Sequence, residues 1–100
     1  MNVIQNNDSD GIRMLTDECI RGGGKIIYNK ILENGMNGIN CSGANNYPLI
    51  KKNYKITYNH LAGVRVEEGA SPTITSNEIF KNLTQGVLVV NGSWANILKN

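Results

Sequence analysis

The chain has 100 residues, of which 40% are hydrophobic and 18% charged, and its formal net charge is +2. This length suits one domain, and the absence of an apolar run of about eighteen residues or of a basic segment before an apolar stretch argues against a membrane span and a secretory signal. The basic residues are scattered along the chain, so charge does not favour nucleic acid as a partner.

Along the chain, eight isoleucines are each followed three residues later by an asparagine. The pairs are Ile4/Asn7, Ile26/Asn29, Ile31/Asn34, Ile50/Asn53, Ile56/Asn59, Ile74/Asn77, Ile79/Asn82 and Ile97/Asn100. The doublet that starts at Ile50 carries one added residue relative to those at Ile26 and Ile74. A glycine follows each second asparagine four residues later, and from Gly11 to Gly38, Gly63 and Gly86 the steps are 27, 25 and 23 residues. Such self-similarity predicts a repeat architecture.

The segments between these residues predict short strands. The run from Gly86 to Gly92 is rich in valine and bounded by turn residues, whereas no segment shows apolar residues at helical spacing over ten or more positions. We therefore predict an all-β fold, a parallel β-helix of about four coils with three short strands in each. It occupies residues 1–100, and because neither end shows a capping segment we expect part of a longer solenoid.

Stacking the coils aligns four inward columns of apolar residues, with a spacing of two within each strand. The columns are Ile26, Ile50, Ile74 and Ile97; Ile4, Ile31, Ile56 and Ile79; Ile12, Ile39, Val64 and Val87; and Met14, Cys41, Val66 and Val89. Cys41 is thus expected to be a core residue, and Cys19, in the longer loop of the first coil, completes no metal-binding spacing with it.

Two asparagine ladders are predicted at the corners of the coil, with amides hydrogen-bonded from one coil to the next. Their members are Asn2, Asn29, Asn53, Asn77 and Asn100, and Asn7, Asn34, Asn59 and Asn82. We expect the asparagines themselves to adopt the left-handed backbone conformation of a sharp corner, and the glycines to supply positive φ or close backbone approach at the third corner.

Asn82 also starts one of three N-glycosylation sequons, with Asn40 and Asn91. A glycan on a ladder asparagine cannot be packed inside a coil. We therefore expect a cytoplasmic or otherwise unglycosylated setting.

A longer motif runs from Gly63 to Asn82, with the pattern G-V-x-V-x-x-G-A-S-P-x-I-x-x-N-x-I-x-x-N. It resembles the right-handed parallel β-helix repeats of the F-box β-helix proteins and the wider CASH-type carbohydrate-binding and sugar-hydrolase β-helices. The resemblance implies a right-handed coil and, from the F-box relatives, a substrate-recognition solenoid of a ubiquitin ligase, although no F-box-like helical segment occurs in these residues. From the enzymes it implies carbohydrate as a ligand, with clustered outward acids, often with calcium, and a basic residue.

Those outward acids can be sought on the strand that follows each glycine. Its outward positions are Arg13, Asn40, Arg65 and Leu88, then Leu15, Ser42, Glu67 and Val90. Only Glu67 with its neighbour Glu68 is acidic there, so we expect no metal site, no cofactor and no catalytic centre. Arg65 and Glu67 point the same way and form either a surface ion pair or a small binding site. His60, at a corner, has no evident partner for catalysis.

Apolar residues at outward positions point to a binding surface instead. Met36, Leu61 and Leu83 lie in one corner, and Leu32, Tyr58 and Phe80 on the adjoining strand. Stacked about 4.8 Å apart, they would form an exposed stripe for a protein partner, or lie under a neighbouring segment. The sequence therefore predicts a non-catalytic module for protein–protein interaction, with part of a carbohydrate-active lyase, epimerase or hydrolase as the alternative.

Overall fold

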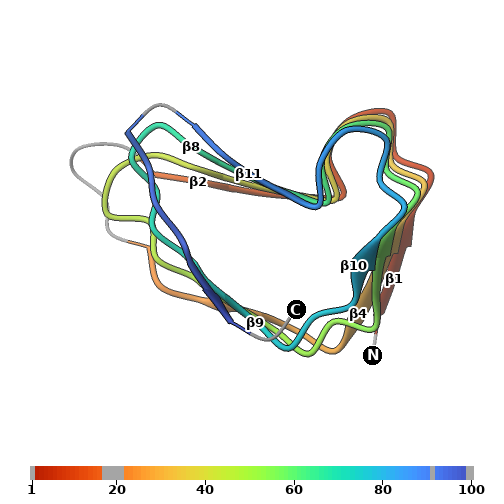
Figure 1. Ribbon diagram of the computed structural model, residues 1–100, viewed down its shortest axis with the longest axis horizontal. Helices are drawn as coiled ribbons and strands as arrows, with labels where there is room; N and C mark the ends of the chain where they lie inside the picture. Colours follow the sequence, from red (N-terminus) through yellow and green to blue (C-terminus); the bar gives the residue numbers. More distant parts are fainter. Residues whose placement is uncertain (1, 17–21, 91, 99–100) are drawn as a thin grey trace.

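The computed structural model describes residues 2–16, 22–90 and 92–98, and within these ranges the chain forms twelve strands and no helix. The strands are β1 Asn2–Gln5, β2 Ile12–Leu15, β3 Lys25–Ile27, β4 Asn29–Leu32, β5 Ile39–Ser42, β6 Leu49–Lys51, β7 Lys55–Thr57, β8 Val64–Glu67, β9 Thr73–Thr75, β10 Ile79–Phe80, β11 Val87–Val89 and β12 Asn96–Leu98. Three successive strands make one turn of the coil (Figure 1). Cys19 and Asn100 lie outside the described residues.

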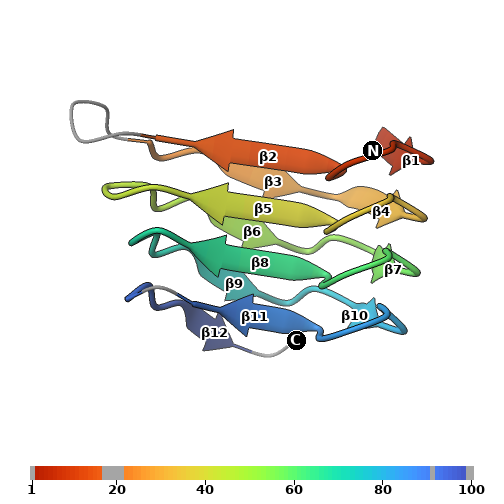
Figure 2. The ribbon, with the colours of Figure 1, turned by 90° about the horizontal axis from the view of Figure 1, so that it is seen from above.

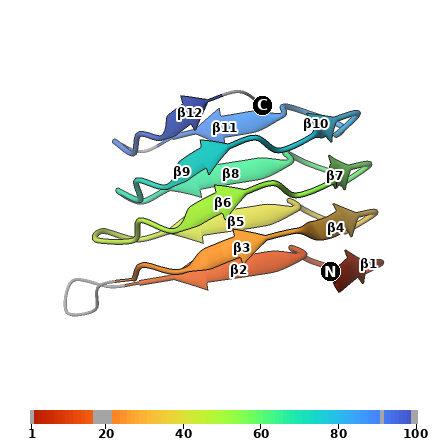
Figure 3. The ribbon, with the colours of Figure 1, turned by 90° about the horizontal axis from the view of Figure 1, so that it is seen from below.

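Every strand pairs in parallel with its counterpart in the next coil, so the described chain is a solenoid of four coils (Figures 2 and 3). The three sheets have the orders β1-β4-β7-β10, β2-β5-β8-β11 and β3-β6-β9-β12. This confirms the predicted all-β architecture of about four coils with three short strands in each.

The strand register aligns the four predicted inward columns. Ile4, Ile31, Ile56 and Ile79 lie opposite one another, as do Ile12, Ile39, Val64 and Val87. In the middle coils these side chains are fully buried, and burying one isoleucine contributes about 1.5–3 kcal/mol. Cys41 lies in the core among them, as predicted.

Both predicted ladders are present among the described asparagines. The side-chain amide of Asn34 donates to Asn59 Oδ1 at 3.0 Å, and that of Asn59 donates to Asn82 Oδ1 at 2.9 Å. The second ladder contains an equivalent bond of 2.8 Å from Asn53 to Asn77. The donating amides of Asn34, Asn53 and Asn59 are almost completely buried, so each bond also removes the cost of an unpaired polar group.

The ladder bonds explain why asparagine keeps a fixed distance from isoleucine. Each amide also donates back to the carbonyl oxygen of the isoleucine in the coil before, as from Asn53 to Ile26 at 3.0 Å. That isoleucine lies just before the same corner, one coil earlier. The equivalent bond is made by Asn77 to Ile50. A shift of one residue would separate the amide from both acceptors.

The sharp turn is made by the residue before each ladder asparagine, which corrects our expectation about the asparagines themselves. All of these residues have φ between 53° and 59°; they are Asn6, Tyr28, Glu33, Lys52, Tyr58, Ser76 and Lys81. The left-handed region disfavours side chains with a Cβ, so the hydrogen-bonded asparagine must hold its neighbour there. The corner residue projects outward and varies freely in chemistry.

At the third corner, Gly11, Gly38 and Gly63 act by close approach and not by positive φ, whereas the nearest atom to a Cβ on Gly86 would be 3.5 Å away. A Cβ on Gly38 would lie 2.7 Å from the carbonyl oxygen of Gly63 and 2.8 Å from Asn59 Nδ2. Beside this glycine, Asn37 is buried and extends a short third ladder, accepting from the backbone N–H of Ala62 and donating to Asp10 Oδ1. Asn37 was not predicted to be a ladder residue, because its neighbours in the column are Asp10 and Ala62 and not asparagines.

Tyr54 is the residue added to the third coil. Asn53 keeps its place in the ladder, Lys55 pairs with Lys30 on β4, and Tyr54 therefore stands out between two positions that are adjacent in the other coils. Its ring centroid lies 6.3 Å from that of Tyr28 in the coil before.

Candidate functional site

The predicted apolar corner is built from the five-residue segments that begin at Asn34, Asn59 and Asn82 and end at the next corner glycine. Backbone hydrogen bonds place Leu61 over Met36, because the Leu61 N–H donates to the Met36 carbonyl oxygen. Leu83 does not continue this column: its N–H donates to Asn59, which aligns it with His60. The predicted stripe of Met36, Leu61 and Leu83 is therefore two adjacent columns, since Leu83 directly follows its asparagine.

The adjoining strand residues show the same offset. Phe80 pairs with Thr57, and Thr57 with Leu32, on the outer face of the β1-β4-β7-β10 sheet. Tyr58 lies one residue further, at the positive-φ corner that it shares with Lys81. Met36, Tyr58, Phe80 and Leu83 are all exposed, and Leu83 keeps 77% of its surface accessible. Their role in binding stays a prediction.

A hollow of about 410 Å³ lies among these side chains. It is lined by Glu33, Tyr58, Asn59, His60, Lys81 and Leu83. The Lys81 ammonium lies 6.0 Å from the Tyr58 ring centroid, at the outer limit of a cation–π contact. His60 also faces a second, larger hollow of about 630 Å³ with Asp8 and Glu33.

Arg65 and Glu67 form the ion pair that the sequence suggested on the outer face of β8. Arg65 Nε donates to Glu67 Oε1 at 2.8 Å, and both side chains are partly exposed. Solvent and salt screen such a pair, so its net contribution to stability is below about 1 kcal/mol. Its use in binding remains a prediction.

The acids of the described chain are dispersed. Among residues 2–16, 22–90 and 92–98, no three histidine, cysteine, aspartate or glutamate side chains come together as a metal-binding group. Burial raises the pKa of the Cys41 thiol from its ordinary value of 9.0 to about 12, because the thiolate would lose its hydration in the core. Asp10 is held in the short third ladder by Asn37.

A comparison with known protein families identifies the right handed beta helix region, which matches residues 1–100. The chain belongs to this β-helix family. No curated protein and no solved structure matches this β-helix significantly. Within its described residues, the β-helix has no helix that is long and apolar enough to cross a membrane.

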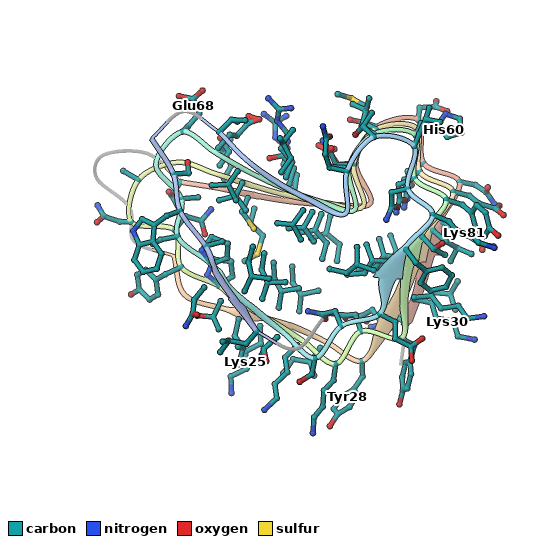
Figure 4. The ribbon with its side chains drawn as sticks, viewed as in Figure 1. Lys25, Tyr28, Lys30, His60, Glu68 and Lys81 are labelled. Atoms are coloured by element: carbon teal, nitrogen blue, oxygen red, sulfur yellow. The ribbon has the colours of Figure 1, made fainter. Side chains whose placement is uncertain are left out.

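A basic and aromatic surface of this β-helix was not predicted from the sequence. Lys30 and Lys55 stand opposite each other on β4 and β7, and with Tyr54 and Glu78 they line a hollow of about 400 Å³. Figure 4 shows Tyr28, Lys30 and Lys81 projecting outward along one stretch of the outline, with Glu68 on the opposite side. The signal in the sequence was the added residue at Tyr54, since Lys30 and Lys55 are 25 residues apart and come together only when the coils are aligned.

Proposed function

We propose that this β-helix is a non-catalytic binding module that recognises another protein. The observation that carries the proposal is the set of exposed apolar side chains on the β1-β4-β7-β10 sheet and in the corners that follow it, Met36, Tyr58, Phe80 and Leu83. Tyr58 and Leu83 line one hollow, and exposed apolar side chains that gather in one place are typical of protein interaction sites. The ladders support the proposal, because they hold the backbone beneath these side chains rigid and so reduce the entropy lost on binding.

The alternative is that the chain is part of a carbohydrate-active enzyme, since the β-helix fold is compatible with either class. A glycosidase needs two carboxyl groups about 5–9.5 Å apart across a sugar, and a lyase of the calcium-dependent kind needs several converging on a metal. On the outward faces of the described strands, Glu67 is already paired with Arg65. These faces therefore support a binding function better than they support either catalytic arrangement.

The substrate-recognition part of an F-box-type ubiquitin ligase is the finer setting that we propose for this module. Its support is the resemblance of the run Gly63–Asn82 to the repeats of such proteins. A cytoplasmic location fits it: Asn40 is buried, and the Asn82 amide donates to the Ile56 carbonyl oxygen, so neither of these two sequon asparagines presents a free amide for a glycan. The third sequon asparagine, Asn91, lies outside the described residues.

Selection of ligands from a displayed library of random twelve-residue peptides tests the binding function. We expect peptides that bind the wild-type chain and lose affinity for Leu83→Ser. Leu15→Ser is the matched control, because Leu15 is a similarly exposed leucine on β2, on another sheet. If every selected peptide binds Leu83→Ser as tightly as the wild type, the apolar corner is not the binding site.

A further inference from the structure

Charge is divided unequally between two sides of the coil. The β3-β6-β9-β12 and β1-β4-β7-β10 sheets, with the corners that follow them, carry six described lysines, Lys25, Lys30, Lys51, Lys52, Lys55 and Lys81, against four acids, Asp8, Asp10, Glu33 and Glu78, a net charge of +2. The β2-β5-β8-β11 sheet and the described loops that follow it carry Arg13 and Arg65 against Glu67 and Glu68, a net charge of zero.

Lys30 and Lys55 form the centre of the basic side. They lie directly opposite each other on neighbouring parallel strands, whose backbones are about 4.8 Å apart. Within the described part of the chain neither makes an ion pair, although Glu78 lies beside Lys55 in the next coil. Like charges in this arrangement repel and destabilise a sheet, and an anionic ligand bound over both ammonium groups would reverse that effect.

Tyr54 interrupts the repeat beside these lysines. Insertions in a solenoid tend to lie on its binding face, because the inward columns cannot absorb them. Here the added residue places a second exposed aromatic ring next to Tyr28, at 6.3 Å, on the edge of the hollow between Lys30 and Lys55.

Apolar side chains continue the same face. Leu32 and Phe80 lie two residues beyond Lys30 and Glu78 on their strands, so they point outward from the same sheet. Beyond them come Tyr58 and Leu83, around the hollow of about 410 Å³. Along β4 of this face a positive residue, Lys30, is therefore followed two residues later by an apolar one, Leu32, with Lys55 and Phe80 in the same two columns on β7 and β10.

We infer that the outer face of the β1-β4-β7-β10 sheet binds an acidic peptide segment in which carboxylate and apolar side chains alternate. The inference rests on the proposed function and adds the chemistry of the partner. An extended peptide running beside β4 and β7 repeats its side chains on one face at every second residue, which is the spacing between the lysine and the apolar columns. A nucleic acid would leave Leu32, Phe80 and Leu83 without apolar partners.

The test is a fluorescence anisotropy titration of the whole chain with a labelled peptide of three Glu-Ser-Leu-Ser repeats. Three further probes separate the contributions of the carboxylates, of the apolar side chains and of negative charge alone. They are the same peptide with glutamine for glutamate, the same peptide with serine for leucine, and an oligothymidylate of equal charge. We expect the parent peptide to bind most tightly and to weaken as salt rises from about 50 to 300 mM.

The decisive variant is Lys30→Gln with Lys55→Gln. It should lower the affinity for the parent peptide about tenfold, because two solvent-screened charge pairs are lost. The control, Arg13→Gln with Lys25→Gln, removes the same net charge away from this face and should change affinity less than about twofold. The Lys30/Lys55 variant should also melt at a slightly higher temperature than the wild type, since a repulsive pair is removed.

Three results would overturn the inference. The first is that the glutamine peptide binds with the same affinity as the parent peptide. The second is that the oligothymidylate binds more tightly than the parent peptide, and the third is that the parent peptide does not bind. If the glutamine peptide binds and its binding depends on Leu83, the binding module stands and only the acidic partner is wrong. If no peptide depends on Leu83 or on the two lysines, the proposed function itself fails.

Discussion

The inward and outward columns of this coil follow opposite rules although they alternate along the same strands. Inward, the column of Ile4, Ile31, Ile56 and Ile79 repeats one residue type through all four coils. Outward, one residue before, the corresponding column holds Val3, Lys30, Lys55 and Glu78. Packing and the ladders restrict the first set, and only solvent or a partner restricts the second. Inward changes should therefore alter stability, and outward changes should alter binding.

The largest expected effect comes from Asn59→Ala, in the middle of a ladder. Asn59 donates to Asn82 and Ile31 and accepts from Asn34, so its loss leaves several buried groups unpaired. We expect a loss of about 3 kcal/mol in the free energy of unfolding, at the upper end of the range for orphaned buried groups. Asn2→Ala, at an exposed ladder position, is the control and should cost less than about 0.5 kcal/mol. Equal losses in chemical denaturation would contradict the ladder's role.

Gly38→Ala should have the next largest effect. The added methyl would meet Gly63 O, Asn59 Nδ2 and Ile56 Cγ2 at 3.0 Å or less, and overpacking of this kind costs about 1–3 kcal/mol. Gly86→Ala is the matched control at the equivalent position, where the nearest atom, Ile79 Cγ2, is 3.5 Å away. Thermal unfolding of the two variants should differ by several degrees, and similar melting temperatures would refute the close-approach explanation.

Cys41 gives a smaller effect that depends on pH. Its pKa is about 12 in the folded chain and near 9.0 when unfolded, so the folded state retains a proton that the unfolded state loses. This part of the stability is complete below pH 9 and should fall by up to about 1.4 kcal/mol per pH unit as pH rises towards 12. Cys41→Val removes this titration. Denaturant midpoints of the two proteins that fall in parallel above pH 9 would show that Cys41 is not responsible.

The smallest effect on stability is expected for outward residues. Leu61→Ser with Phe80→Ser should leave the unfolding free energy within about 1 kcal/mol of the wild type, because Phe80 is exposed and Leu61 only half-buried. Affinity for peptides selected on the wild-type chain should fall. Unfolding of the double variant would show that these residues belong to the core.

The sequence predicted the inward columns well and the outward surface poorly, for a physical reason. Inward positions can be recognised by their repetition, because each coil needs an isoleucine and an asparagine at the same places to pack against and hydrogen-bond to the neighbouring coil. Outward residues have no such periodicity, so Leu83 was assigned to the column of Leu61 when it belongs with His60. The lysines were judged scattered because Lys30 and Lys55 lie opposite each other only after the chain has been wound into coils. Tyr54 was visible as an added residue, but its projection beside Tyr28 required the backbone.

The added residue at Tyr54 has a consequence for how such a gene can change. An in-frame insertion of a single codon normally shifts every later side chain of a strand to the wrong face. Here the next asparagine, Asn59, returns to its ladder and the following coil starts in register again. Successive coils can therefore gain or lose codons independently, which is why steps of 27, 25 and 23 residues coexist in one solenoid. An insertion or a surface substitution in one coil therefore leaves the register and the packing of the other coils unchanged.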